Sequence, residues 1–186
     1  MSIRKCTLAA LAACVSSGFP IASAEATTRF NFTSQPWKLE RKFERQEVRF
    51  QSDEKPGTII ISTRKRYLWY VLGNGKAIRY GIGVGRSGFQ WNGTEKISRK
   101  AEWPSWRPPK EMLEREPDLP AFMPGGPENP LGARALYLGN TLYRIHGTSQ
   151  PWTIGTRVSS GCIRLTNENI IDLYKRAGVG AKVIVR

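Results

Sequence analysis

The chain of 186 residues contains 29 lysines and arginines against 15 acidic residues, which gives a formal net charge of +14. Its length suits one domain with terminal extensions, and a hydrophobic fraction of 40% with six tryptophans excludes a disordered chain. A basic chain suits an anionic partner, but the longest basic run is Arg64-Lys65-Arg66, so no nucleic-acid partner is predicted. A generally cationic surface explains the charge at least as well as a dedicated patch.

Residues 1–24 have the features of a secretory signal peptide. Arg4 and Lys5 form the positive region, residues 8–15 form a short apolar region, and Ala22-Ser23-Ala24 supplies the cleavage site. We therefore predict an exported protein, located in the periplasm or the cell wall, whose mature chain begins at Glu25.

The cysteine positions affect how the N-terminus is predicted to be processed and which thiol remains in the mature protein. Leu11-Ala12-Ala13-Cys14 is similar to a lipoprotein box, and a membrane is a partner only if Cys14 is lipidated there. The apolar region ahead of Cys14 is very short for that, so simple secretion is preferred. Cys6 and Cys14 then leave with the signal, and Cys162 is the single cysteine of the mature protein. Such a cysteine indicates a free reactive thiol, with a buried inert cysteine as the alternative.

Residues 25–55 are charged and irregular, and we predict an N-terminal extension that packs on or tethers a domain formed by residues 56–186. From residue 58 on, β-branched and aromatic segments alternate with glycine-containing turns, such as Gly73-Asn74-Gly75 and Asn92-Gly93. The predicted strands are residues 58–63, 67–72, 77–84, 96–103, 135–138, 141–145 and 181–185. In the third strand, Gly81 and Gly83 predict close approach by another backbone or a ligand.

Two further segments complete the predicted fold. A helix follows Thr166, which is a good N-cap, and ends at Gly178. Eight of the twelve prolines lie between Pro104 and Pro130, which predicts a long irregular loop with one short helix near residues 110–115. We interpret this loop as a substrate cover, with a static cap as the alternative. The prediction is a mainly β fold, an all-β sandwich or partly closed barrel with one clear helix.

His146, the only histidine, stands at the end of a predicted strand, sixteen positions before Cys162. A thiol with a pKa of about 8.5 is mostly protonated at neutral pH, so this pair indicates a nucleophile with its base. The amides of Gly161 and Cys162 are expected to form an oxyanion hole. Arg164 is expected on the same face as Cys162, where it favours thiolate, binds a substrate carboxylate or forms a structural salt bridge.

Rival chemistries fit this stretch less well. One histidine and one cysteine are too few for a zinc site, so no metal is predicted. A serine hydrolase built on Ser159 or Ser160 is conceivable, but the thiol is the better nucleophile. Because no acidic residue is near in the sequence, a backbone carbonyl is expected to orient His146.

The segment His146-Gly147-Thr148 followed by Ser159-Ser160-Gly161-Cys162-Ile163-Arg164-Leu165 resembles the signature of the L,D-transpeptidase (YkuD-type) catalytic domain family. The resemblance extends from about Gln46 to the C-terminus and includes residues 56–58, 80–85 and 123–127. Many members of the family have histidine where this chain has Ser160, which leaves the role of that position open.

The resemblance implies a β-sandwich of the L,D-transpeptidase type that acts on peptidoglycan stem peptides without a cofactor. It assigns Cys162 as nucleophile and His146 as base and acid. Our own candidates for oxyanion or substrate binding are Gly147, Ser160, Gly161 and Arg164. The thiol would attack the bond between the third-residue diamino acid and D-alanine, and an amine of another stem peptide or of an acceptor protein would resolve the thioester. Water as the acceptor, giving a carboxypeptidase or hydrolase, and a non-catalytic wall-binding module are the alternatives.

Overall fold

The computed structural model describes residues 37–186, so the predicted signal peptide and the lipoprotein box at Cys14 lie outside the described residues. Its strands are β1 (Gln46–Arg49), β2 (Ile59–Ser62), β3 (Tyr67–Gly73), β4 (Lys76–Gly81), β5 (Val84–Gly85), β6 (Gly93–Glu102), β7 (Arg134–Leu138), β8 (Arg144–His146), β9 (Arg157–Ser159), β10 (Ile163–Arg164) and β11 (Lys182–Val185). The helices are α1 (Lys110–Arg115) and α2 (Asn167–Arg176), with short 3₁₀ turns at Arg41–Phe43 and Pro151–Thr153. None of these helices is long and apolar enough to cross a membrane.

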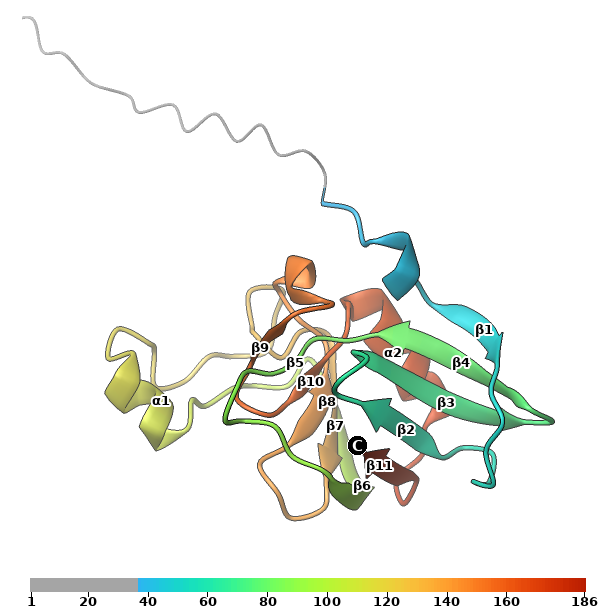
Figure 1. Cartoon of the computed structure of the whole chain (residues 1–186). Helices are drawn as coiled ribbons and strands as arrows, with labels where there is room; N and C mark the ends of the chain where they lie inside the picture. Colours follow the sequence, from blue (N-terminus) through green and yellow to red (C-terminus); the bar gives the residue numbers. More distant parts are fainter. Residues whose placement is uncertain (1–36) are drawn as a thin grey trace, which may run out of the picture. The chain divides into compact units, whose positions relative to one another are not determined.

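Nine of the described strands form one sheet in the order β1-β4-β3-β2-β11-β6-β7-β8-β10, and β5 pairs with β9 separately (Figure 1). The long strand β6 joins two halves of the sheet, because residues 93–96 pair with β11 and residues 97–102 pair with β7. Its register shifts between Ile97 and Arg99, as at a β-bulge. Buried side chains from both halves form one core, which confirms the predicted mainly β fold.

Helix α2 forms hydrogen bonds with both halves of the sheet. Its Thr166 cap is confirmed, since the Thr166 hydroxyl accepts the Asn169 N–H at 3.2 Å. From one half, the Tyr80 hydroxyl donates to Asp172 of the helix at 2.6 Å. From the other, the Lys100 ammonium donates to the carbonyls of Tyr174 and Ala177 at the helix end, at 2.6 and 2.8 Å. These charge-assisted bonds fix the helix that follows the cysteine-containing loop.

Several element boundaries differ from the sequence prediction. The strand predicted over residues 77–84 ends at Gly81, and Gly83 instead exchanges two backbone hydrogen bonds of 2.9 Å with Arg164. The predicted turn at Asn92-Gly93 is wrong, because Gly93 already pairs with Val185 as the first residue of β6. Helix α2 ends through the extended residue Ala177 rather than through a glycine cap at Gly178.

Glycines in the third predicted strand do allow close backbone approach, as predicted. A Cβ atom at Gly83 would lie 2.9 Å from the carbonyl oxygen of Thr153, and one at Gly81 would overlap Phe43. The backbone next to the cysteine-containing segment is therefore packed too tightly for side chains at these positions.

The Pro-rich segment is irregular apart from helix α1, as predicted. Trp106 and Met123 bridge its two arms through backbone hydrogen bonds of 2.8 and 2.9 Å. The buried Asn129 side chain donates to the carbonyls of Met123 and Pro124 and accepts the N–H of Leu131. These bonds hold the segment in place without a regular ladder.

The described residues before β2 are part of the packed structure. Strand β1 pairs antiparallel with β4, and Phe43 is 3% exposed beneath Gly81 and Gly155. The Phe43 ring also lies 5.5 Å from that of Tyr67, centroid to centroid.

Replacing Phe43 by alanine should therefore destabilise the protein by about 3–5 kcal/mol, because it empties a filled apolar site. The matched control is Val179→Ala, since Val179 is 64% exposed, and that change should cost less than about 0.5 kcal/mol. Urea unfolding followed by fluorescence measures both. Equal losses for the two variants would show that the segment before β2 is not part of the folded unit.

Candidate active site

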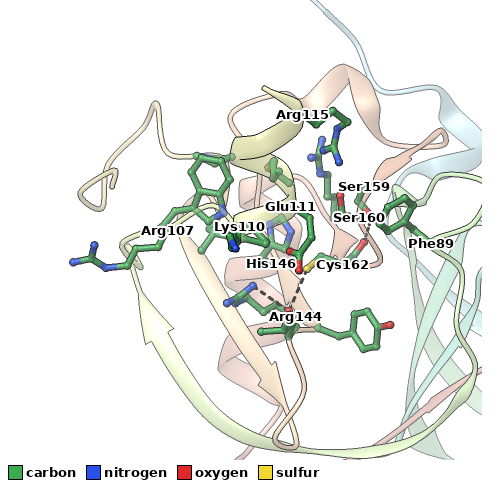
Figure 2. Close-up of a pocket in the computed structure, with 18 residues that line it drawn as sticks. Phe89, Arg107, Lys110, Glu111, Arg115, Arg144, His146, Ser159, Ser160 and Cys162 are labelled. Atoms are coloured by element: carbon green, nitrogen blue, oxygen red, sulfur yellow. Dashed lines mark hydrogen bonds between the residues drawn. The ribbon is translucent and has the colours of Figure 1, made fainter. Parts of the chain in front are cut away.

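Parallel pairing of β8 with β10 brings His146 and Cys162 to one place. Ile145 lies opposite Ile163 and His146 opposite Arg164, so Cys162 immediately precedes the paired residues. His146 and Cys162 line the same cavity of about 650 Å³ (Figure 2). Helix α1 of the Pro-rich segment also lines it, through Lys110, Glu111, Met112 and Arg115. The static-cap and substrate-cover interpretations both agree with this position.

The His146 ring is fixed in one tautomer by a backbone carbonyl. Its Nδ1 lies 2.6 Å from the Gly147 carbonyl oxygen, which only accepts, so Nδ1 carries the proton and Nε2 keeps its lone pair. Burial, together with the positive charges of Arg164 and Arg144, lowers the pKa of His146 to about 3. The imidazole is therefore neutral at pH 7, as a base requires.

Gly147 orients the histidine, whereas the sequence analysis placed it in oxyanion or substrate binding. Its N–H donates to the Arg134 carbonyl at 3.0 Å. The Asn167 side-chain oxygen accepts the N–H groups of Ala133 and of Thr148, the residue after Gly147, at 2.9 and 3.2 Å. A Cβ at Gly147 would overlap this oxygen, so only glycine fits.

The Cys162 thiol is partly buried and has a weak contact with the Leu142 carbonyl oxygen, 3.8 Å from Sγ. No hydrogen bond joins Sγ to the imidazole in this conformation, although both face the cavity. Burial raises the pKa of the thiol, and the charges of Arg144 and Arg164 oppose this shift. At neutral pH the resting pair is therefore a neutral thiol and a neutral imidazole.

The loop before Cys162 is held by a buried serine. Ser159 Oγ donates to the Cys162 carbonyl at 2.6 Å and accepts the Gly161 N–H at 3.2 Å. The Gly161 amide is thus already paired, which argues against its predicted place in an oxyanion hole. The N–H groups of Ser160 and Cys162 have no acceptor in the part of the chain that the structure describes.

Two aromatic residues support Gly161 from outside the loop. Trp91 Nε1 donates to the Gly161 carbonyl at 2.9 Å, and the Trp91 ring stacks on Tyr143 at 4.3 Å. Gly161 has a φ of +104°, and a Cβ there would lie 2.6 Å from the Tyr143 ring. Glycine is therefore required at this position.

Ser160 faces the cavity and is bound by a residue that sequence reasoning missed. Its hydroxyl accepts from Arg86 Nη1 at 2.9 Å, and the Arg86 guanidinium stacks over Phe89 at 4.0 Å. The serine-hydrolase alternative loses support, because both Ser159 and Ser160 hydroxyls are engaged and neither contacts His146.

Arg164 lines the cavity as predicted, and Arg144 lines it too. The sequence analysis missed Arg144, although its position two residues before His146 on a strand was a signal for a shared face. Within residues 37–186 no group of three or more His, Cys, Asp or Glu side chains is placed to hold a metal ion.

The lowered pKa of His146 predicts a pH-dependent stability. Between about pH 3 and 6.5 the unfolded chain binds a proton on this ring and the folded chain does not. The contribution of His146 to the free energy of unfolding is fully present above pH 6.5 and decreases as the pH drops toward 3. Lowering the pH from about 7.5 to about 4.5 should destabilise wild type by about 3 kcal/mol through this ring, and His146→Gln should remove that part of the loss. Urea unfolding at both values measures it, and identical pH slopes in wild type and variant would refute the assignment.

Because its pKa is raised, Cys162 is predicted to form the thiolate only at high pH. The thiolate absorbance that is present in wild type and absent from Cys162→Ala should appear with a midpoint above 9.0. Arg144→Gln should move this midpoint higher, because it removes an opposing positive charge. A midpoint near neutral pH would show instead that the resting pair is a thiolate and an imidazolium.

The chain matches the YkuD family model, described as the L,D-transpeptidase catalytic domain, over residues 56–185. Probable L,D-transpeptidase YbiS of Escherichia coli strain K12 is 42% identical over 134 residues, which cover 68% of this chain and 43% of that protein. The chain therefore matches less than half the length of this relative.

Solved structures agree on the fold. The structure of a probable carnitine operon oxidoreductase, caia, from Brucella melitensis is 48% identical, with a TM-score of 0.54, over 80% of this chain and 96% of that one. That name concerns the Brucella protein alone. The catalytic domain of the Enterococcus faecium L,D-transpeptidase is 16% identical with a TM-score of 0.56, over 73% of this chain and 100% of that one, and it supports the fold only. Because the family model matches 130 of the 186 residues, the chain belongs to the YkuD family of L,D-transpeptidase catalytic domains.

Proposed function

We propose that this chain is an exported peptidoglycan L,D-transpeptidase in which Cys162 is the nucleophile and His146 the general base and acid. The observation that carries the proposal is their common cavity, in which the carbonyl of Gly147 holds the proton of His146 on Nδ1. Membership of the family supplies the substrate class, the stem peptides of peptidoglycan.

The first half of the reaction forms a thioester. The Cys162 sulfur attacks the carbonyl carbon between the diamino acid and D-alanine, and its proton passes to Nε2 of His146. The free N–H groups of Cys162 and Ser160 stabilise the negative oxygen of the tetrahedral intermediate. The C–N bond then breaks, and the imidazolium gives its proton to the departing amine of D-alanine.

The second half transfers the acyl group. An acceptor amine attacks the thioester, His146 takes its proton, and the thiol is regenerated when that proton returns to sulfur. An amine of a second stem peptide gives a cross-link, and a lysine of a protein gives a wall-attached protein. Attack by water gives a carboxypeptidase or hydrolase from the same acyl-enzyme.

The remaining predicted residues take supporting roles. Arg164 binds a substrate carboxylate, because it lines the cavity and forms no ion pair within the described chain. Ser160 contributes its backbone N–H, while its hydroxyl ties the loop to Arg86. Residues 1–24 direct export by simple secretion, which places the enzyme in the periplasm or cell wall beside its substrate.

Cys162→Ala should abolish release of D-alanine from tetrapeptide muropeptides, because no other thiol is present among the described residues. The matched control is Thr63→Ala, a conservative change at a hydroxyl residue outside the cavity, which should leave the rate unchanged within about twofold. Liquid chromatography of released D-alanine measures both. Continued release by Cys162→Ala protein would refute the assignment of the nucleophile.

Mass spectrometry of the same reactions separates the alternatives. New cross-linked dimers identify an amine acceptor, whereas trimmed tripeptides alone identify water. Binding to sacculi with no covalent carbapenem adduct on Cys162 would instead support a non-catalytic wall-binding module.

A further inference from the structure

Gly161 and Cys162 carry four backbone polar groups, and three of them are paired inside the protein. The Gly161 N–H donates to Ser159 Oγ at 3.2 Å, and the Cys162 carbonyl accepts from the same hydroxyl at 2.6 Å. The Gly161 carbonyl accepts from Trp91 Nε1 at 2.9 Å. Only the Cys162 N–H has no acceptor within residues 37–186. Because an N–H group with neither an acceptor nor water is rare in folded proteins, this one is expected to meet water or a ligand.

The bond from Trp91 determines the direction of this free N–H. The peptide unit between Gly161 and Cys162 is planar and trans, because the described residues contain no cis peptide bond. In such a unit the carbonyl and the following N–H point in opposite directions. Cys162 lines the cavity, whereas Trp91 is not among the residues that line it (Figure 2). The indole therefore holds the carbonyl away from the cavity and the Cys162 N–H toward it.

The peptide unit needs this support because it follows a glycine. Gly161 has a φ of +104°, and glycine has a wider choice of backbone conformations than any other residue. A peptide unit next to glycine can therefore rotate at little steric cost. Fixing its carbonyl is the direct way to give its N–H one direction.

The indole of Trp91 is itself held in place. Its ring stacks on that of Tyr143, with the centroids 4.3 Å apart and the planes at 5° to each other. It also packs against the hydrophobic core. The indole N–H can only donate, so it binds the carbonyl without competing for the N–H of the same peptide. A donor on the carbonyl also polarises the peptide unit, which strengthens its N–H as a donor.

We propose that Trp91 is a positioning residue for the reaction. Through the Gly161 carbonyl it directs the Cys162 N–H at the negative oxygen of the tetrahedral intermediate. The bond to Trp91 is already formed in the free protein, so the donor does not have to reorient when the charge develops. This inference rests on the proposed function and adds to it a residue that lies outside the cavity.

Two reactions of the same thiol separate this role from a general effect on Cys162. Release of D-alanine from a tetrapeptide passes through a tetrahedral oxyanion. Alkylation by iodoacetamide does not, because the sulfur displaces iodide from a saturated carbon, a thioether forms and the thiol proton goes to solvent.

Trp91→Phe keeps a ring against Tyr143 and removes the N–H donor. It should lower kcat for D-alanine release about tenfold to a hundredfold, somewhat less than complete loss of an oxyanion donor. KM should stay within about twofold, because the oxyanion exists only in the transition state. The rate of alkylation should also stay within about twofold, because the reactivity of the thiol itself is unchanged.

Trp69→Phe is the matched control, because it makes the same change at a second stacked tryptophan. The Trp69 ring packs on that of Phe50, with centroids 5.2 Å apart, and Trp69 does not line the cavity. Both reactions should stay within about twofold of wild type. Benzothienylalanine at position 91 is a second test variant, since it keeps both fused rings and has sulfur in place of the N–H. It should reproduce the effect of Trp91→Phe, and thermal unfolding verifies that each protein is folded.

A loss in alkylation as large as that in D-alanine release, or no loss in either reaction, would overturn the inference. Failure of wild type to release D-alanine would refute the proposed function instead. The role of Trp91 is then measured with p-nitrophenyl acetate, whose acetyl group passes to the Cys162 sulfur through a tetrahedral oxyanion with release of nitrophenolate. Trp91→Phe should slow this acylation about tenfold relative to alkylation, and an unchanged ratio of the two rates would overturn the inference.

Discussion

The parallel pairing of β8 with β10 is the constraint on which the candidate active site depends. It sets His146 opposite Arg164 and places Cys162 one residue before the paired segment. The Leu165 N–H extends the pairing with a bond of 2.8 Å to the His146 carbonyl, and Gly83 pairs with Arg164 through two backbone bonds. Parallel neighbours require a long crossover, which the residues between His146 and Cys162 supply.

Burial and positive charge together determine the chemistry of the pair. The same low-dielectric surroundings that lower the pKa of His146 also raise the pKa of Cys162, so both groups rest uncharged. The positive charges of Arg144 and Arg164 favour thiolate and disfavour imidazolium.

Sequence reasoning predicted what depends on local pattern. It found the mainly β class, the Thr166 cap, the short helix at 110–115 and the position of His146 at a strand end. It also required a backbone carbonyl for the histidine, and the structure places that of Gly147 there.

The rest depends on contacts between distant segments. Strands β5, β9 and β10 are only two or three residues long, so no periodicity can mark them. The bond from Arg86 to Ser160 and the stack of Trp91 on Tyr143 join parts of the chain that are far apart in sequence.

The most direct test of the whole account is mass spectrometry of wild-type protein mixed with a tetrapeptide donor and quenched in acid. A tripeptide acyl group mapped to Cys162 is the predicted result, and an acyl group on Ser159 or Ser160, or none at all, would contradict it.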